Sequence, residues 1–172
     1  MINVEKYTKY PANGWGSMWV GDPDKTYGLE QPGGWIYNIM PFMTLDVIHE
    51  IALNKPDTFN EMARVKAYMV PMFICSSRRK AKTYPGSENS YNAATPNLVA
   101  KTDYAGNGGT WVAYGPGADA GCQNKYPNCT WRLTQPAVDW TTSEAGDNTR
   151  ANFNGIFGLM AQTKPASIRD GN

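Results

Sequence analysis

The sequence has no long hydrophobic run and almost no excess of charge. Its longest apolar stretch, residues 68–75, is interrupted by Pro71 and is far shorter than the roughly 18 residues that a membrane-spanning helix needs. The 16 Lys and Arg residues nearly balance the 15 Asp and Glu residues, so the chain lacks the strong positive field that attracts nucleic acid. We therefore expect no nucleic-acid partner, and contact with a membrane only through a segment outside this sequence.

Histidine is almost absent as well, which limits the enzymatic mechanisms open to the chain. A Ser-His-Asp triad would rest on His49 alone, and no Gly-x-Ser-x-Gly nucleophile motif is present. His49 lies in an amphipathic stretch, where a structural histidine is the more common case. No acidic pair stands out as a glycosidase pair. We expect no enzymatic activity and no catalytic residue; a secreted hydrolase that uses His49 or carboxylates is the second alternative.

Cysteine is also scarce, with three residues in the chain. Cys122 and Cys129 lie in a polar segment that is rich in turn-forming residues, with six residues between them, and this spacing favours a local disulfide. Two free thiols, or half of a metal site, are the alternatives. Zinc is disfavoured because no second pair of Cys or His residues lies at ligand spacing. Cys75, in an apolar run, is predicted to be a buried small residue or an odd thiol.

What the sequence does have is an unusual mixture of 17 Gly, 12 Pro, 6 Trp and 10 Tyr residues. Gly and Pro favour chain reversals, and large amphipathic rings bury well while they keep a polar edge exposed. A chain of 172 residues fits one core. We therefore predict a single, loop-rich α+β domain over residues 1–172, with irregular chain pinned by aromatic rings over residues 7–34.

Two short helices are predicted in the first half. Apolar residues recur at three- and four-residue steps over residues 41–53, with Pro41 in the first turn. A second helix is predicted from Thr58, because Thr58 and Glu61 form a capping-box pattern, and its buried face would include Phe59, Met62 and Ala63.

Pro71 is expected to end the second helix, and residues 72–75 are predicted to form a short buried strand. In the second half, short strand candidates alternate with clusters of Gly, Pro, Asn and Asp; these candidates are residues 97–101, 110–114, 130–134 and 155–160. The pattern predicts a loop-rich antiparallel sheet.

Two oxygen-rich turns are candidate calcium sites, one at Asp22 and Asp24 and the other at Asp103 and Asn107. The alternative is that these residues cap their own turns, and no complete calcium-binding loop is present. No other cofactor is indicated. The short basic patch at residues 77–80 has two structural interpretations, a solvated strand end or a pair of ion-pairing arginines.

The tryptophans raise a different function, because exposed rings can stack on sugars. A secreted glycan- or solute-binding module is therefore the first alternative, and its stacking residues would be Trp15, Trp19, Trp111, Trp131 and Trp140. The same rings can equally belong to the core.

Five motifs occur in a defined order along the chain: PxxGWG at residues 11–16, QPGGWIYNIMPF at 31–42, FICSSRR at 73–79, TDYAGNG at 102–108, and NGIF at 154–157 before IRDG at 168–171. The series resembles the secreted bacterial proteins of domain of unknown function 1559, over nearly the whole chain. Full-length members look like relatives of type IV pilins and pseudopilins, with a cleaved prepilin helix followed by a soluble domain. The resemblance assigns no catalytic residue.

The sequence departs from the family pattern at both ends, where the apolar prepilin helix and the end of the domain are missing, so we expect a fragment. Ser76 and Phe42 stand where members commonly have Pro and Tyr. The resemblance implies a pilin-like soluble domain, an extracytoplasmic location in the cell envelope or outside the cell, and other pilin-like subunits or further copies of the chain as partners. A non-enzymatic subunit of a filament or secretion assembly is the leading hypothesis.

Overall fold

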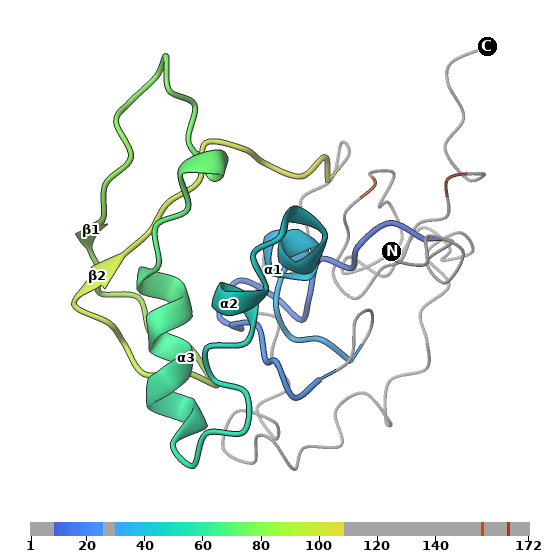
Figure 1. Ribbon diagram of the computed structural model, residues 1–172, viewed down its shortest axis with the longest axis vertical. Helices are drawn as coiled ribbons and strands as arrows, with labels where there is room; N and C mark the ends of the chain where they lie inside the picture. The colour runs from blue at the N-terminus through green and yellow to red at the C-terminus, as the bar shows by residue number, and fades with distance from the viewer. Residues whose placement is uncertain (1–8, 26–29, 109–155, 157–164, 166–172) are drawn as a thin grey trace, which may run out of the picture.

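The computed structural model describes residues 9–25, 30–108, 156 and 165 (Figure 1). Three helices come early, α1 (Trp35–Ile39), α2 (Asp46–His49) and α3 (Thr58–Ala67), with 3₁₀ turns η2 (Met40–Met43) and η3 (Pro71–Phe73). They are followed by two strands, β1 (Tyr84–Pro85) and β2 (Leu98–Val99). In this part of the chain, no helix has the length and apolar character required to cross a bilayer. Short early helices, a small antiparallel sheet and much loop confirm the α+β class in its general form.

The predicted helix over residues 41–53 is wrong in its continuity. The segment divides into η2 and α2, and it follows α1, which was not predicted. The break occurs at Thr44, whose φ of 59° lies in the left-handed region and cannot continue a helix. Its side-chain hydroxyl and the amide of Leu45 are bonded to carbonyls of η2. Apolar periodicity therefore located the buried face correctly but could not detect the interruption.

Helix α3 begins at Thr58 as predicted, but its cap is a different residue. Asp57 precedes the helix, and its carboxylate accepts a hydrogen bond of 3.2 Å from the amide of Asn60. Met62 and Ala63 are buried, as predicted, whereas Phe59 is 50% exposed, which contradicts its predicted burial. The reason is that the core cluster on this helix forms around Met62 and does not extend to the first turn.

The predicted strand over residues 72–75 is also wrong. Pro71 opens η3, where Phe73 and Ile74 donate backbone hydrogen bonds of 3.0 Å to carbonyls three residues back. Proline favours this turn because its φ is already fixed near the helical value. Phe73 and Ile74 are buried, but Met72 is 50% exposed, so only part of the apolar run enters the core.

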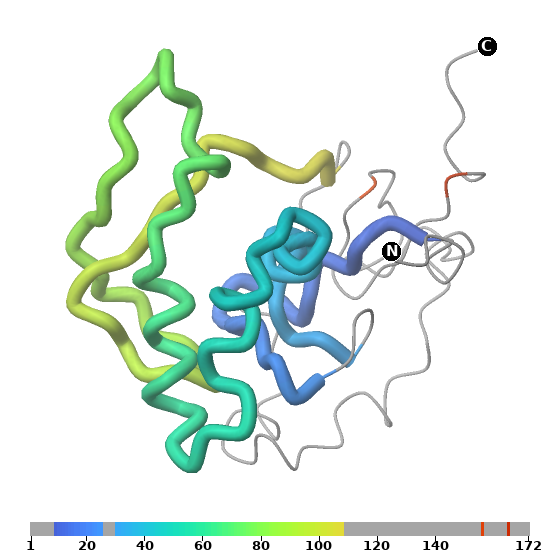
Figure 2. Tube along the Cα trace, viewed as in Figure 1, coloured from blue at the N-terminus to red at the C-terminus, as the bar shows by residue number. Residues whose placement is uncertain are grey.

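The sheet consists of β1 and β2, which pair antiparallel with Tyr84 opposite Val99 and Pro85 opposite Leu98. Strand β2 falls within the predicted range 97–101, whereas β1 was not predicted. The candidates at 110–114 and 130–134 lie outside the described residues, as does all of 155–160 except Ile156. In Figures 1 and 2 the chain leaves α3, runs out to a tip and returns through β1 and β2 beside the helix. The amide of Ala100 fixes this return by donating to the carbonyl of Lys66 at 2.8 Å.

The core is built from two clusters of buried side chains. The first gathers residues of α1, η2, α2 and η3, namely Tyr37, Met40, Ile48, Val70 and Phe73. The second joins α3 to distant loops through Val20, Ala52, Met62 and Ala93. Because the strands are so short, the loops must be held by side-chain hydrogen bonds as well as by apolar packing.

Candidate functional site

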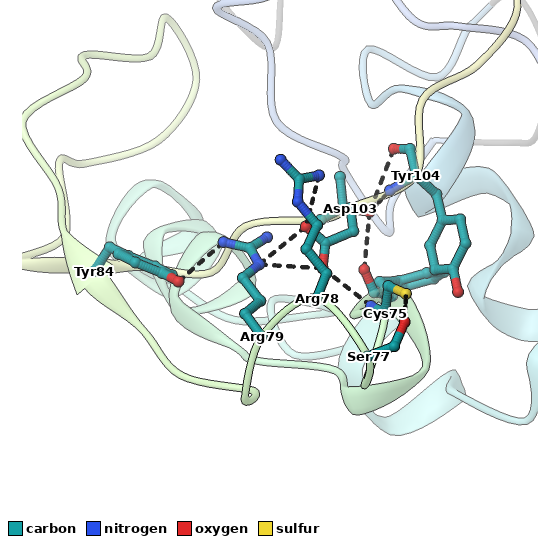
Figure 3. A network of polar contacts seen from close by, with 9 residues as sticks. Cys75, Ser77, Arg78, Arg79, Tyr84, Asp103 and Tyr104 are labelled. Carbon is teal, nitrogen blue, oxygen red and sulfur yellow. Dashed lines mark hydrogen bonds and ion pairs between the residues drawn. The ribbon is translucent and has the colours of Figure 1, made fainter.

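A densely connected polar group lies where the chain after η3 meets residue 103 (Figure 3). The carboxylate of Asp103 is 3% exposed and accepts bonds from Arg79 Nε at 2.9 and 3.1 Å and from the amide of Cys75 at 3.0 Å. Arg78 adds an ion pair of 3.2 Å. We call this group, Cys75, Arg78, Arg79, Tyr84 and Asp103, the Asp103 clasp.

The clasp is formed by local turns and by one long-range backbone contact. The amides of Arg78 and Arg79 donate to the carbonyl of Cys75 at 2.9 and 3.1 Å, which turns both arginines back toward the chain. From the other segment, the amide of Asp103 and the hydroxyl of Thr102 donate to one carbonyl of η3, that of Phe73, at 2.9 and 3.1 Å. The carboxylate is thereby placed against the two arginines.

Arg79 extends the clasp to the sheet. Its Nη1 donates to the hydroxyl of Tyr84 at 3.0 Å, while its Nε remains on Asp103 (Figure 3). A planar guanidinium can serve both partners at once because its donors point in fixed, different directions. The clasp therefore ties the η3 segment, β1 and residue 103 together.

The electrostatics keep the clasp charged at neutral pH. Burial raises the pKa of Asp103, but the hydrogen bonds from Arg79 and Cys75 and the charges of both arginines lower it further, so the net pKa lies below its ordinary value. The hydrogen bonds to Asp103 and Tyr84 raise the pKa of Arg79. A carboxylate in this state accepts hydrogen bonds and does not donate a proton, which fits a structural role.

Two further buried amides hold loops in the first half of the chain. Gln31 accepts from the amides of Asp22 and Gly33 at 2.8 and 3.1 Å and donates to the carbonyl of Asp22 at 2.8 Å. Asn38 donates to the carbonyls of Ala12, Gly33 and Gly34 at 2.9–3.2 Å. Neither residue was proposed as a site from the sequence.

A third buried amide joins segments that are far apart in the sequence. Asn92 is 3% exposed, and its side chain bonds both the amide and the carbonyl of Val20, at 2.9 and 2.8 Å. The side chain of Asn92 thus satisfies the backbone groups of Val20, as a neighbouring strand would do in a sheet.

The two calcium candidates have different surroundings from those a cation requires. Asp22 is 2% exposed, and its carboxylate accepts a hydrogen bond of 2.9 Å from the amide of Asp24. This bond caps the turn, as the alternative interpretation of the two residues expects. Both oxygens of Asp103 face arginines, while the carbonyl of Asn107 accepts from Ile156 at 2.9 Å. Within residues 9–25 and 30–108, no three Asp, Glu, His or Cys side chains lie together as a metal site would need.

His49 belongs to the core. It is 6% exposed and stacks on Tyr37 with 4.3 Å between the ring centroids, and the Tyr37 hydroxyl donates to the His49 carbonyl at 2.6 Å. Burial lowers the pKa of His49, and the charge of Asp46 offsets part of this effect. These contacts favour the structural interpretation of this residue.

The family comparison covers almost the entire chain. Residues 3–172 match the model described as "Protein of unknown function (DUF1559)", whose short name is SBP_bac_10. The chain belongs to this family. No curated protein and no solved structure matches it.

Within this DUF1559 chain, two tryptophans proposed as stacking residues lie in the core. Trp15 and Trp19 are 5% and 6% exposed. Their rings meet edge to face, with 5.0 Å between the ring centroids. The ring of Trp19 also meets the ring of Tyr91 edge to face, with 5.4 Å between the two centroids. Both rings therefore belong to the core, which was the alternative to a stacking role. Trp111, Trp131 and Trp140 lie outside the described residues.

The cysteine predictions are only partly covered by the described chain. Cys122 and Cys129 lie outside it, so their disulfide stays a prediction. Cys75 is a free, half-buried thiol, with its sulfur 3.1 Å from the hydroxyl of Ser77. Hydrogen bonding from Ser77 lowers the pKa of this thiol.

Proposed function

We propose that this DUF1559 chain is a non-enzymatic, pilin-like subunit of a cell-envelope or extracellular filament or secretion assembly. The observation that carries the proposal is the use of the polar motif residues. Gln31, Asn38, Arg79 and Asp103 all bind backbone or one another. Gln31 closes a loop of nine residues, and the other three tie together segments 24 or more residues apart. Residues used in this way stabilise a scaffold, whereas a catalytic group faces a substrate.

The resemblance to pilin relatives supplies the assembly class. Full-length relatives carry a prepilin helix, which implies an extracytoplasmic domain attached to an envelope structure, with other pilin-like subunits or copies of the same chain as partners. The loop-rich α+β fold is compatible with this assignment. A scaffold that presents long loops from a small core is suited to contacts between subunits.

The exposed apolar residues indicate where such contacts would form. Phe42 in η2, Val47 in α2 and Met72 in η3 are 43%, 82% and 50% exposed. All three elements also contribute to the first core cluster, so the exposed residues stand on a packed base. Large apolar side chains on rigid elements are typical of protein–protein contacts.

Site-specific cross-linking in the source organism tests this proposal. A photoreactive amino acid placed at position 47 in the full-length protein should form cross-links to another copy of the chain or to another pilin-like subunit. The same substitution at position 98, where Leu98 is 48% exposed on the sheet, serves as the matched control. Equal, sparse cross-linking at both positions in an intact envelope would contradict assembly through the exposed apolar residue of α2.

A solute-binding module is the second candidate, and the family's short name SBP_bac_10 is the observation that favours it. Because Trp15 and Trp19 lie in the core, a bound solute would have to contact other residues. Titration of the chain with neutral oligosaccharides, followed by tryptophan fluorescence, distinguishes the two functions. Saturable binding to the purified monomer would favour the solute-binding module over the subunit.

A further inference from the structure

Two lysines from different segments converge on one tyrosine of the sheet. The Nζ atoms of Lys82 and Lys101 lie 5.0 and 5.2 Å from the centroid of the Tyr84 ring. The guanidinium carbon of Arg79 lies 5.4 Å from the same centroid. Three cationic groups therefore share a single aromatic ring.

The strand register explains why the two lysines meet. Tyr84 pairs with Val99, and the same antiparallel register continued by two residues places Lys82 opposite Lys101. Side chains two residues apart point to the same side of a strand, so both lysines lie on the side of Tyr84. Like charges directly opposite each other on a sheet are destabilising. The sequence thus places a repulsive pair just beyond the end of the two-stranded ladder.

No described carboxylate compensates this pair. Across residues 30–108, the ion pairs of the neighbouring cations run to Asp103, and that carboxylate is already bound by Arg78 and Arg79. Lys82 and Lys101 are exposed, and neither forms an ion pair with a described residue. We call Arg79, Lys82 and Lys101 around Tyr84 the basic face.

The clasp holds this face in a defined shape. Arg79 is fixed by Asp103 on one side and by the Tyr84 hydroxyl on the other, so the ring around which the cations gather is itself held in place (Figure 3). A preorganised group of cations loses less conformational entropy when an anion binds. The same clasp that stabilises the fold therefore also prepares a recognition surface.

We propose that the basic face binds an acidic polysaccharide, whose carboxylate or sulfate groups lie between Lys82 and Lys101. The partly exposed ring of Tyr84 supplies an amphipathic edge beside the lysines, and the lysines supply the charge. A chain with a net charge of +1 lacks the long-range field for a nucleic-acid partner, so recognition is by close contact.

A lipid surface fits the basic face less well. Insertion into a headgroup layer requires an exposed apolar side chain beside the cations. The apolar residue that shares the side of Tyr84 and the two lysines, Val99, is only partly exposed. The inference concerns a ligand and does not depend on the pilin-like assembly.

Binding of defined polymers to the purified 172-residue chain tests the inference. Polygalacturonate and dextran sulfate are expected to bind in calorimetric titration, neutral dextran is not, and added salt should weaken the binding. In the double variant Lys82→Gln/Lys101→Gln, affinity should fall by roughly tenfold or more. The double variant Lys9→Gln/Lys55→Gln removes the same charge from two exposed positions elsewhere and should change affinity by less than about twofold.

Three results would overturn the inference: no binding of either acidic polymer, equal losses in the two double variants, or lysine-dependent binding only to vesicles of phosphatidylglycerol and phosphatidylcholine. The last result would assign the face to lipid. Removing the lysine pair should leave the urea unfolding midpoint unchanged or raise it. Should that variant fold poorly, the single variants Lys82→Gln and Lys101→Gln carry the same test, each with a smaller loss. Failure here leaves cross-linking at position 47 unaffected, so the two proposals fail separately.

Discussion

Met62 is the residue whose replacement most directly tests how α3 is held against the rest of the chain. Its side chain is 0% exposed and packs with Val20, Ala52 and Ala93, which come from three other segments. Truncating a buried methionine to alanine typically costs about 2–5 kcal/mol, because transfer energy is lost and a cavity remains. Alanine regains a few tenths of a kcal/mol in helix propensity. We therefore expect Met62→Ala to lower the free energy of unfolding by about 2–4 kcal/mol.

Urea denaturation followed by far-ultraviolet circular dichroism measures this loss, provided that the slope against urea is unchanged. Phe59→Ala in the same helix is the matched control. Although its apolar spacing predicted burial, Phe59 is 50% exposed and belongs to neither core cluster, so its truncation should cost about 1 kcal/mol or less. Equal losses for the two variants would refute the packing described for α3.

Three further perturbations follow from the loops and the buried histidine. Gly21→Ala should lower the free energy of unfolding by about 1–3 kcal/mol, because the added methyl group would overlap the ring of Tyr37. Asn92→Ala should cost about 2 kcal/mol or more, since two buried backbone groups lose their partner. His49 has a lowered pKa in the folded chain, so the unfolded chain binds a proton first, and stability should fall as the pH drops below about 6.5. Urea titrations at pH 7 and pH 5 measure all three effects, and His49→Gln should reduce the pH dependence.

The two loop substitutions each have a matched control. Gly34→Ala should be nearly neutral, because the nearest atoms to its added carbon are 3.7 and 3.8 Å away. Thr95→Ala removes an exposed hydrogen bond of 2.9 Å and should change stability by less than about 0.5 kcal/mol. A neutral Gly21→Ala, an Asn92→Ala loss no larger than that of Thr95→Ala, or an unchanged pH slope in His49→Gln would each contradict its own argument.

Local features of the fold were predictable where one short segment carries the signal. The start of α3 at Thr58 and the burial of Met62 and Ala63 follow from capping residues and apolar spacing. The division of residues 41–53 into η2 and α2 was not predictable, because it depends on the left-handed backbone of Thr44, a residue that rarely adopts this conformation. Apolar spacing reports which side is buried and says little about such a break.

For the Asp103 clasp, too, the sequence pattern predicted only part of what the structure shows. The sequence left open that the arginines at 78 and 79 form ion pairs, and this interpretation is confirmed. Their partner could not be named, because Asp103 is 24 residues from Arg79 and no local pattern links them. The repulsive pair of Lys82 and Lys101 depends in turn on the register of β1 and β2, and β1 was not predicted.

The central claim is that this chain serves as a structural subunit of an envelope assembly. Mass spectrometry of the native protein from sheared surface filaments and from the remaining cell fractions tests it most directly, by reading the mature N terminus and the proteins that copurify. The account predicts that the chain is enriched in the sheared fraction together with other pilin-like subunits, and that it follows a processed, methylated apolar helix. Recovery only as an unprocessed monomer outside the filament fraction would contradict it and favour the solute-binding module.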